Sequence, residues 1–216
     1  MFTFHHVRAQ IKLAGIPIVL VVAATAAATN YDEAIHGDLS GDRLNPTQLA
    51  LSAGTNSLSA TSGAFGEEEI EYDREYVRID LPANHQLDSI RLQAYDSPDG
   101  TAFVGLQDGT TFSFEPDDAI MNIGNMRGYA HFGPGEGHNI GDDILPAIAA
   151  GAGAMGFTPP LTGSSYTFWL QQTGASTTYQ LDFIVTNVPE PASALLMCTA
   201  IAAAAALVRR RAVRPC

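Results

Sequence analysis

Cysteine and lysine are nearly missing from this chain of 216 residues. Both cysteines, Cys198 and Cys216, lie near the C-terminus, so the rest of the chain can hold neither a disulfide scaffold nor a zinc site with cysteine ligands. The one lysine, Lys12, lies in the N-terminal leader, which excludes a Ser-x-x-Lys catalytic pair further along. Gly-x-Ser-x-Gly and His-Glu-x-x-His motifs are also missing, so the sequence does not indicate an enzyme.

Positive charge is scarce between residues 29 and 189, where five arginines stand against 22 acidic residues. A segment with this net charge of −17 repels phosphate backbones, which excludes nucleic-acid binding. Over the whole chain only 16% of residues are charged, while 46% are hydrophobic. Much of the apolar character lies at the two ends, so we consider the ends and the middle separately.

Residues 1–28 are typical of an export signal peptide. Arg8 and Lys12 give a weakly basic start, and an apolar run follows at 16–24. Alanines at 24, 26 and 28 then supply two of the small-x-small patterns that signal peptidase cleaves. The alternative is an uncleaved N-terminal anchor, for which the apolar run is short. We therefore expect a signal helix that is removed on export.

The C-terminal end predicts a membrane span. Residues 192–208 form a run of 17 residues without a charge, and three arginines follow it at once. At about 1.5 Å per helical residue, this run is just long enough to cross the hydrocarbon core. The arginines should stay on the cytoplasmic side, which places the acidic middle of the chain outside.

A stiff acidic segment immediately precedes this span. Two prolines around a carboxylate give an extended stretch that cannot join a helix, and the four residues are Val188, Pro189, Glu190 and Pro191. With the span and the cluster Arg209, Arg210 and Arg211, this segment closely resembles the PEP-CTERM sorting signal. The resemblance assigns residues 188–216 to that signal and implies removal of the tail by the membrane protease exosortase, in a host that makes exopolysaccharide. A tail retained as a plain anchor is the alternative.

Residues 29–187 predict one acidic, mainly β domain. Apolar and polar residues alternate with a period of two, and turn residues separate the alternating runs. Such a pattern is typical of an antiparallel sandwich. The strands are expected at 76–81, 90–95, 102–106, 112–114, 166–171 and 179–185. Residues 52–66 and the loop-rich insertion 115–160 are not expected to form strands, but a short helix is predicted at 143–150, with Asp142 or Asp143 as its cap.

Two stretches of the middle resemble bacterial pre-peptidase C-terminal-like domains. The first is residues 73–83, an acidic and aromatic strand that ends in a proline turn, and the second is the closing pair of tyrosine-bearing strands at 165–181. The resemblance implies a jelly-roll-like sandwich of the kind attached to secreted enzymes and surface proteins.

The insertion contains the main candidates for a metal site. Glu136, Asp142 and Asp143 lie close together in the sequence, and carboxylate oxygens in an exported acidic domain favour a structural calcium ion. His131 and His138 lie in the same segment, so a transition metal is a weaker alternative. A packed loop with exposed histidines and no metal is the interpretation that we favour over either metal site.

A second stretch resembles the start of a calcium loop of the dockerin type. Asp38, Ser40 and Asp42 have the spacing of its first three ligands. However, Arg43 stands where the turn glycine is needed, and Leu49 stands where a bidentate acid is needed. We therefore expect a polar turn here.

These features favour an exported, non-catalytic protein of the cell surface or extracellular matrix. The alternatives are a secreted carbohydrate-active hydrolase that uses carboxylates of the insertion, and a carbohydrate-binding module. Trp169 with Tyr166 and Tyr179 could stack on a sugar ring, but aromatic residues in alternating strands more often belong to the core.

Overall fold

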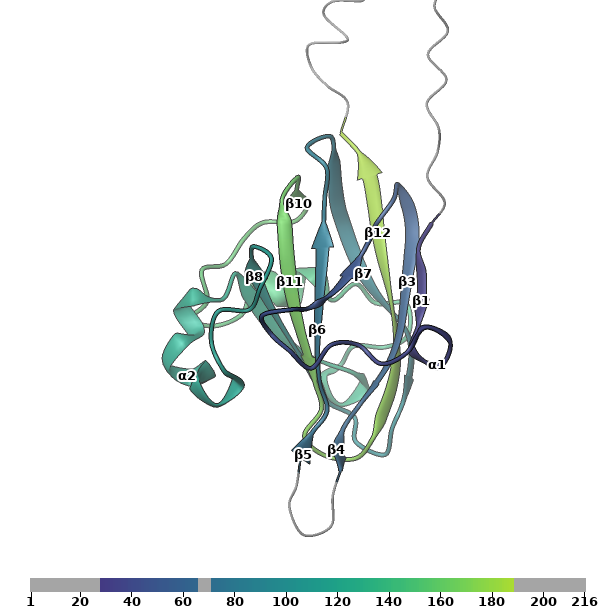
Figure 1. The fold of residues 1–216 in the computed structure, drawn as a ribbon, viewed down its shortest axis with the longest axis vertical. Helices are drawn as coiled ribbons and strands as arrows, with labels where there is room; N and C mark the ends of the chain where they lie inside the picture. Colours follow the sequence, from purple (N-terminus) through teal and green to yellow (C-terminus); the bar gives the residue numbers. More distant parts are fainter. Residues whose placement is uncertain (1–27, 66–70, 189–216) are drawn as a thin grey trace, which may run out of the picture.

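The computed structural model describes residues 28–65 and 71–188, and two five-stranded sheets pack face to face in it (Figure 1). The first sheet has the order β1 (Asn30–Asp32), β3 (Gly54–Ser62), β12 (Thr177–Asn187), β7 (His85–Asp96) and β10 (Leu161–Thr162). The second has the order β2 (Thr47–Leu49), β6 (Arg74–Asp80), β11 (Ser165–Gln171), β8 (Ala102–Asp108) and β9 (Gly128–Phe132). A separate pair, β4 (Ala64–Phe65) and β5 (Glu71–Tyr72), extends from one end.

The mainly β prediction is confirmed, but the sheets are mixed rather than purely antiparallel. At one edge of each sheet a short strand runs parallel to its neighbour, β1 beside β3 and β2 beside β6. Both short strands belong to the N-terminal segment, which crosses from the edge of the first sheet to the edge of the second (Figure 1). All other pairs are antiparallel.

Five expected strands are present as β6, β7, β8, β11 and β12, each of them longer than the alternating run that predicted it. The short helix is also present, as α3 (Leu145–Ala149). The expected cap is wrong: the N-cap position is held by Ile144, which makes no side-chain cap, although Asp143 just before it accepts a hydrogen bond from the Leu145 N–H at 3.0 Å. Two further short helices, α1 (Glu33–His36) and α2 (Ala119–Asn122), were not expected.

Three expectations were wrong. Residues 52–66 contain β3, a nine-residue strand whose small side chains hid the alternation between a buried and an outer face. The insertion contains β9, which pairs with β8. Residues 112–114 are no strand, because the Ser113 N–H donates to the Gln107 side chain at 2.7 Å and the Phe112 N–H donates to the Arg43 carbonyl at 2.8 Å, outside any sheet.

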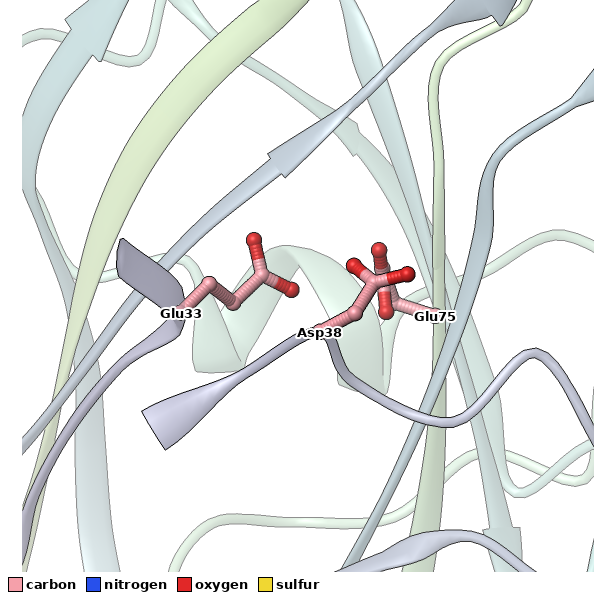
Figure 2. A group of neighbouring side chains, drawn as sticks. All are labelled: Glu33, Asp38 and Glu75. Atoms are coloured by element: carbon pink, nitrogen blue, oxygen red, sulfur yellow. The ribbon is translucent and has the colours of Figure 1, made fainter. Parts of the chain in front are cut away.

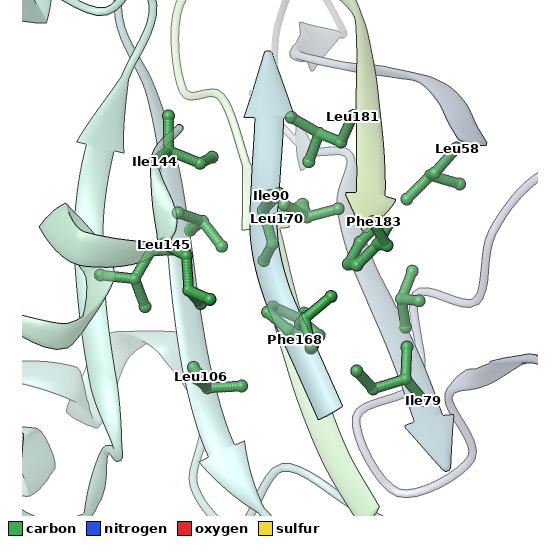
Figure 3. Close-up of a cluster of buried hydrophobic side chains, with 14 of the residues drawn as sticks. Leu58, Ile79, Ile90, Leu106, Ile144, Leu145, Phe168, Leu170, Leu181 and Phe183 are labelled. Atoms are coloured by element: carbon green, nitrogen blue, oxygen red, sulfur yellow. The ribbon is translucent and has the colours of Figure 1, made fainter. Parts of the chain in front are cut away.

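Apolar side chains fill the space between the sheets (Figure 3). Phe168 of β11 meets Phe183 of β12 edge to face across the sandwich, with ring centroids 5.7 Å apart. Leu145 of α3 is fully buried against the same core. A second cluster covers the outer side of the second sheet, where the residues after β8 fold back over it; its members are Tyr76, Phe112, Phe114, Met126 and Trp169.

Both ends of the described chain lie at the same end of the sandwich. Asn30 of β1 pairs with Ser57, and Val185 of β12 pairs with Gly54, where β3 begins. The β4–β5 pair lies at the opposite end (Figure 1). Within the two described ranges, no helix is long and apolar enough to cross a membrane. The expected signal helix and the expected span at 192–208 lie outside the described residues.

Candidate metal centre

The segment that crosses between the sheet edges brings acidic side chains toward β6. Helix α1 begins after Asp32, whose carboxylate accepts a hydrogen bond from the Ala34 N–H at 3.0 Å. It ends at Gly37, whose φ of +92° favours glycine. The chain then reaches the second sheet, where the Ser40 carbonyl accepts a hydrogen bond from the Tyr76 N–H at 2.8 Å.

Three carboxyl groups meet at this crossing. Glu33 comes from α1, Asp38 from the loop after it, and Glu75 from β6. One oxygen of each lies within 4.8 Å of one oxygen of both others. Figure 2 shows Glu33 and Glu75 reaching from opposite sides toward Asp38. Like charges at such distances repel strongly, so the arrangement needs a proton or a cation to neutralise part of the charge.

Glu75 is the most unusual member of this group. In β6 it shares a side with Val77 and Ile79, so it points into the sandwich, and its exposed fraction is 0%. Neither of its oxygens accepts a hydrogen bond of ordinary geometry. The neighbouring arginines of β6 pair elsewhere, Arg74 with Asp117 and Arg78 with Asp80.

Glu33 is held in place by the backbone. One of its oxygens accepts a hydrogen bond from the Leu39 N–H at 3.2 Å, and the other accepts from the Thr61 N–H at 2.6 Å. The first bond closes the turn that carries Asp38, and the second ties that turn to β3. Asp38 itself is exposed, so the group has one buried, one half-buried and one exposed carboxylate.

The electrostatics reflect this crowding. Burial, and after it the charges of Glu33, Asp73 and Asp38, raise the pKa of Glu75 to about 9. Burial also raises the pKa of Glu33 and that of Asp73, and in each case the charge of Asp38 adds to the rise. Glu75 therefore carries a proton at neutral pH unless a cation replaces it.

The donor set is made of oxygen atoms alone. Carboxylates without histidine or cysteine suit hard cations, of which Ca²⁺ and Mg²⁺ are the common examples. Ca²⁺ accepts six to eight oxygens in flexible geometry, whereas Mg²⁺ demands a near-ideal octahedron and usually retains several waters. Three carboxylates from three different segments therefore fit Ca²⁺ better than Mg²⁺.

The acids that the sequence singled out serve other roles. Glu136 accepts a hydrogen bond from the Thr101 hydroxyl at 3.1 Å, and Asp142 accepts from the Asn139 N–H at 2.7 Å. Asp143 accepts from the N–H groups of Ile90 and Leu145, both at 3.0 Å. In the described part of the chain these three carboxylates do not form a group with metal-ligand spacing.

The two histidines of the insertion do not join a metal-compatible group in the described residues either. The ring of His131 lies edge-on to Phe103, with centroids 5.6 Å apart. His131 and Phe103 line a cavity of about 310 Å³, and Asp99 is the one acidic residue among those that line it.

Sequence reasoning missed Glu33 and Glu75, and it judged Asp38 as part of a continuous loop. A signal for Glu75 was present, because it occupies an inward position of an otherwise apolar strand face. The aromatic trio considered for sugar stacking is buried, with exposed fractions of 4% for Trp169, 5% for Tyr166 and 1% for Tyr179. These three residues belong to the core, as is usual for aromatic residues in alternating strands.

Of the sorting motif, only Val188 lies within the described residues. Val188 donates its N–H to the Asn84 carbonyl at 2.7 Å, while Pro189, Glu190, Pro191 and the arginines 209–211 lie outside the described residues.

Comparison with known proteins found no match: no family model fits the chain, and no curated protein or solved structure is significantly similar to it.

Proposed function

We propose that this chain is an exported, non-catalytic protein of the cell surface or extracellular matrix, sorted by exosortase after removal of its leader by signal peptidase. The observation that carries the proposal is the order of features at 188–211: a Pro-Glu-Pro segment, an uncharged run and an arginine cluster, behind the leader at 1–28. Exopolysaccharide of the same host is the partner that this route implies.

The placement of the chain ends supports display from one end. Residues 30 and 185 lie at the same end of the first sheet, so a domain tethered there would direct its other end away from the membrane. That other end carries Phe65 and Tyr72, which are 53% and 40% exposed. A jelly-roll-like winding is part of the proposal, supported by the way the chain alternates between the sheets from β6 through β7 to β8.

A non-catalytic role is favoured by how the described acids are used. Glycoside hydrolysis needs two carboxylates that flank the bond to be broken. The cavity beside Phe103 has the single carboxylate of Asp99, and the candidate acids of the insertion accept hydrogen bonds that organise their own loops.

Replacement of Pro189, Glu190 and Pro191 by alanine in the native host tests the sorting route. Alanine favours helix, so the span should still insert while the extended recognition segment is lost. We expect the full-length variant to accumulate in the membrane fraction, with its intact mass showing an uncleaved tail. Alanines at Pro116, Asp117 and Asp118 are the control, since they alter another Pro-acid segment and should leave release unchanged. Release of the first variant at the parent's rate would contradict the proposal.

A further inference from the structure

We propose that Glu33, Asp38 and Glu75 bind a calcium ion that ties the N-terminal crossing segment to the second sheet. The inference concerns the folded domain, so it holds or fails independently of the export route. Three separate segments supply the ligands: α1, the loop after it, and β6.

The first argument is the convergence of charge. Three carboxylates within 4.8 Å of one another come from positions 33, 38 and 75, so chain proximity alone does not explain the group. In the described residues all four arginine ion pairs are made with other acids, at Asp80, Asp108, Glu115 and Asp117. None of these arginine pairs neutralises Glu33, Asp38 or Glu75, so the charge of the three carboxylates is available to a cation from solution.

The second argument is independent of the first and rests on Glu75 alone. A fully buried carboxyl group normally accepts several hydrogen bonds, because burial without them costs free energy. Glu75 is 0% exposed, and its oxygens have no hydrogen-bond partner apart from the neighbouring carboxyl group of Asp73, which is another acid. The side chain points to Asp38 and Glu33 (Figure 2), so an ion bound between them would satisfy it.

The surrounding structure holds the ligands at the required positions. Leu39, next to Asp38, is 4% exposed and packs in the core, and the Ser40 N–H donates to the Thr47 hydroxyl at 2.9 Å. The two residues after Asp38 are therefore held in place, Leu39 by the core and Ser40 by Thr47 of β2. An exposed third ligand leaves room for water to complete the coordination sphere.

The chemistry of the ligands selects calcium. A donor set of oxygen atoms alone disfavours the soft and borderline metals, which prefer cysteine and histidine. Three carboxylates at moderate spacing favour Ca²⁺ over the smaller Mg²⁺, which tolerates distortion poorly. Calcium sites of extracellular modules have dissociation constants of about 10⁻⁴ to 10⁻³ M, and we expect this site to fall in that range.

Isothermal titration of the full-length chain, held in mild detergent and freed of metal with chelator, tests the proposal. CaCl₂ should bind with one ion per chain, and MgCl₂ should bind more weakly. Asp38→Asn is the main variant because Asp38 is exposed and its loss does not threaten the fold. It should weaken calcium binding at least about tenfold, and Glu75→Gln should do the same.

Glu136→Gln and Asp142→Asn are matched controls that remove acids from the other candidate segment. Both should bind calcium like the parent, and all four variants should show the buried-Trp169 fluorescence of the folded chain. The proposal is overturned if the parent binds no calcium up to about 10 mM, well above the expected range. It is also overturned if Asp38→Asn and Glu75→Gln keep the parent's affinity, or if only the control variants lose it.

Discussion

Without calcium, the stability of this domain should fall as the pH rises through neutrality, and Glu75 should be the cause. The raised pKa of Glu75, about 9, stands against an ordinary value of 4.5 in the unfolded chain. Between these values the folded state holds a proton that the unfolded state has released. The free energy of unfolding is therefore greatest below the unfolded pKa, and the contribution of Glu75 is lost as the pH rises toward about 9.

The size of the effect follows from one proton per molecule. Each pH unit inside this window changes the free energy of unfolding by about 1.4 kcal/mol, so the interval from pH 6 to pH 8 costs about 2.7 kcal/mol. The slope depends only on the one proton that Glu75 keeps in the folded state and releases in the unfolded state. The acids around Glu75, Glu33 and Asp73, also have raised pKa values, so each of them lowers the stability with rising pH over its own titration range.

Urea unfolding in chelator at pH 6, 7 and 8 measures this slope. Trp169 is the one tryptophan of the chain and is 4% exposed, so its fluorescence reports unfolding. Glu75→Gln removes the titrating group at nearly constant size and should flatten the dependence. Millimolar CaCl₂ should flatten the parent's dependence as well, since the ion replaces the proton. A parent without a slope, or a Glu75→Gln variant that retains it, would refute the reasoning.

Three further outcomes are expected. Calcium at about ten times its dissociation constant should stabilise the parent by about 1.4 kcal/mol. The melting temperature should then be a few degrees higher than in chelator at matched ionic strength. At the same calcium concentration, Asp38→Asn should reduce the stabilisation to about 0.4 kcal/mol or less. Phe168→Ala should lower the free energy of unfolding by about 3–5 kcal/mol, because it removes a ring packed across the core, whereas Ile35→Ala, at a position that is 76% exposed, should change it little. A reporter enzyme active only in the cytoplasm should be active when fused after Cys216, and inactivity would contradict the predicted orientation.

Alternation identified most of the sandwich because it is strong where large side chains face the core. Residues of β12 alternate between buried Tyr179, Leu181, Phe183 and Val185 and more polar neighbours, so the sequence predicts that strand plainly. β3 has the same burial pattern, yet its inward positions include Asn56, Ala60 and Ser62. Such side chains carry little hydrophobic signal, so pairing with β12 rather than local preference makes this segment a strand.

Phe112 and Phe114 show the opposite error. Their spacing predicts a strand, and both are indeed buried, with ring centroids 5.0 Å apart. They pack on the outer side of the second sheet, which makes Tyr76 and Trp169 buried on a face that a two-layer sandwich would leave to solvent. Period-two alternation reports which side chains are buried, but it does not report whether the backbone has a strand beside it.

The candidate metal centre depends on topology in a way that local spacing cannot express. The sequence around Asp38 resembles the start of a continuous calcium loop, which fails at Arg43 and Leu49. In the fold, Asp38 lies beside Glu33, five residues earlier in α1, and beside Glu75 of β6 in the second sheet. The two parallel edge pairs bring them together, because β1 and β2 bind to opposite sheets and force the segment between them across the open edge beside β6. An inward-facing acid on an apolar strand is the part of such a site that a sequence can reveal, and here it is Glu75.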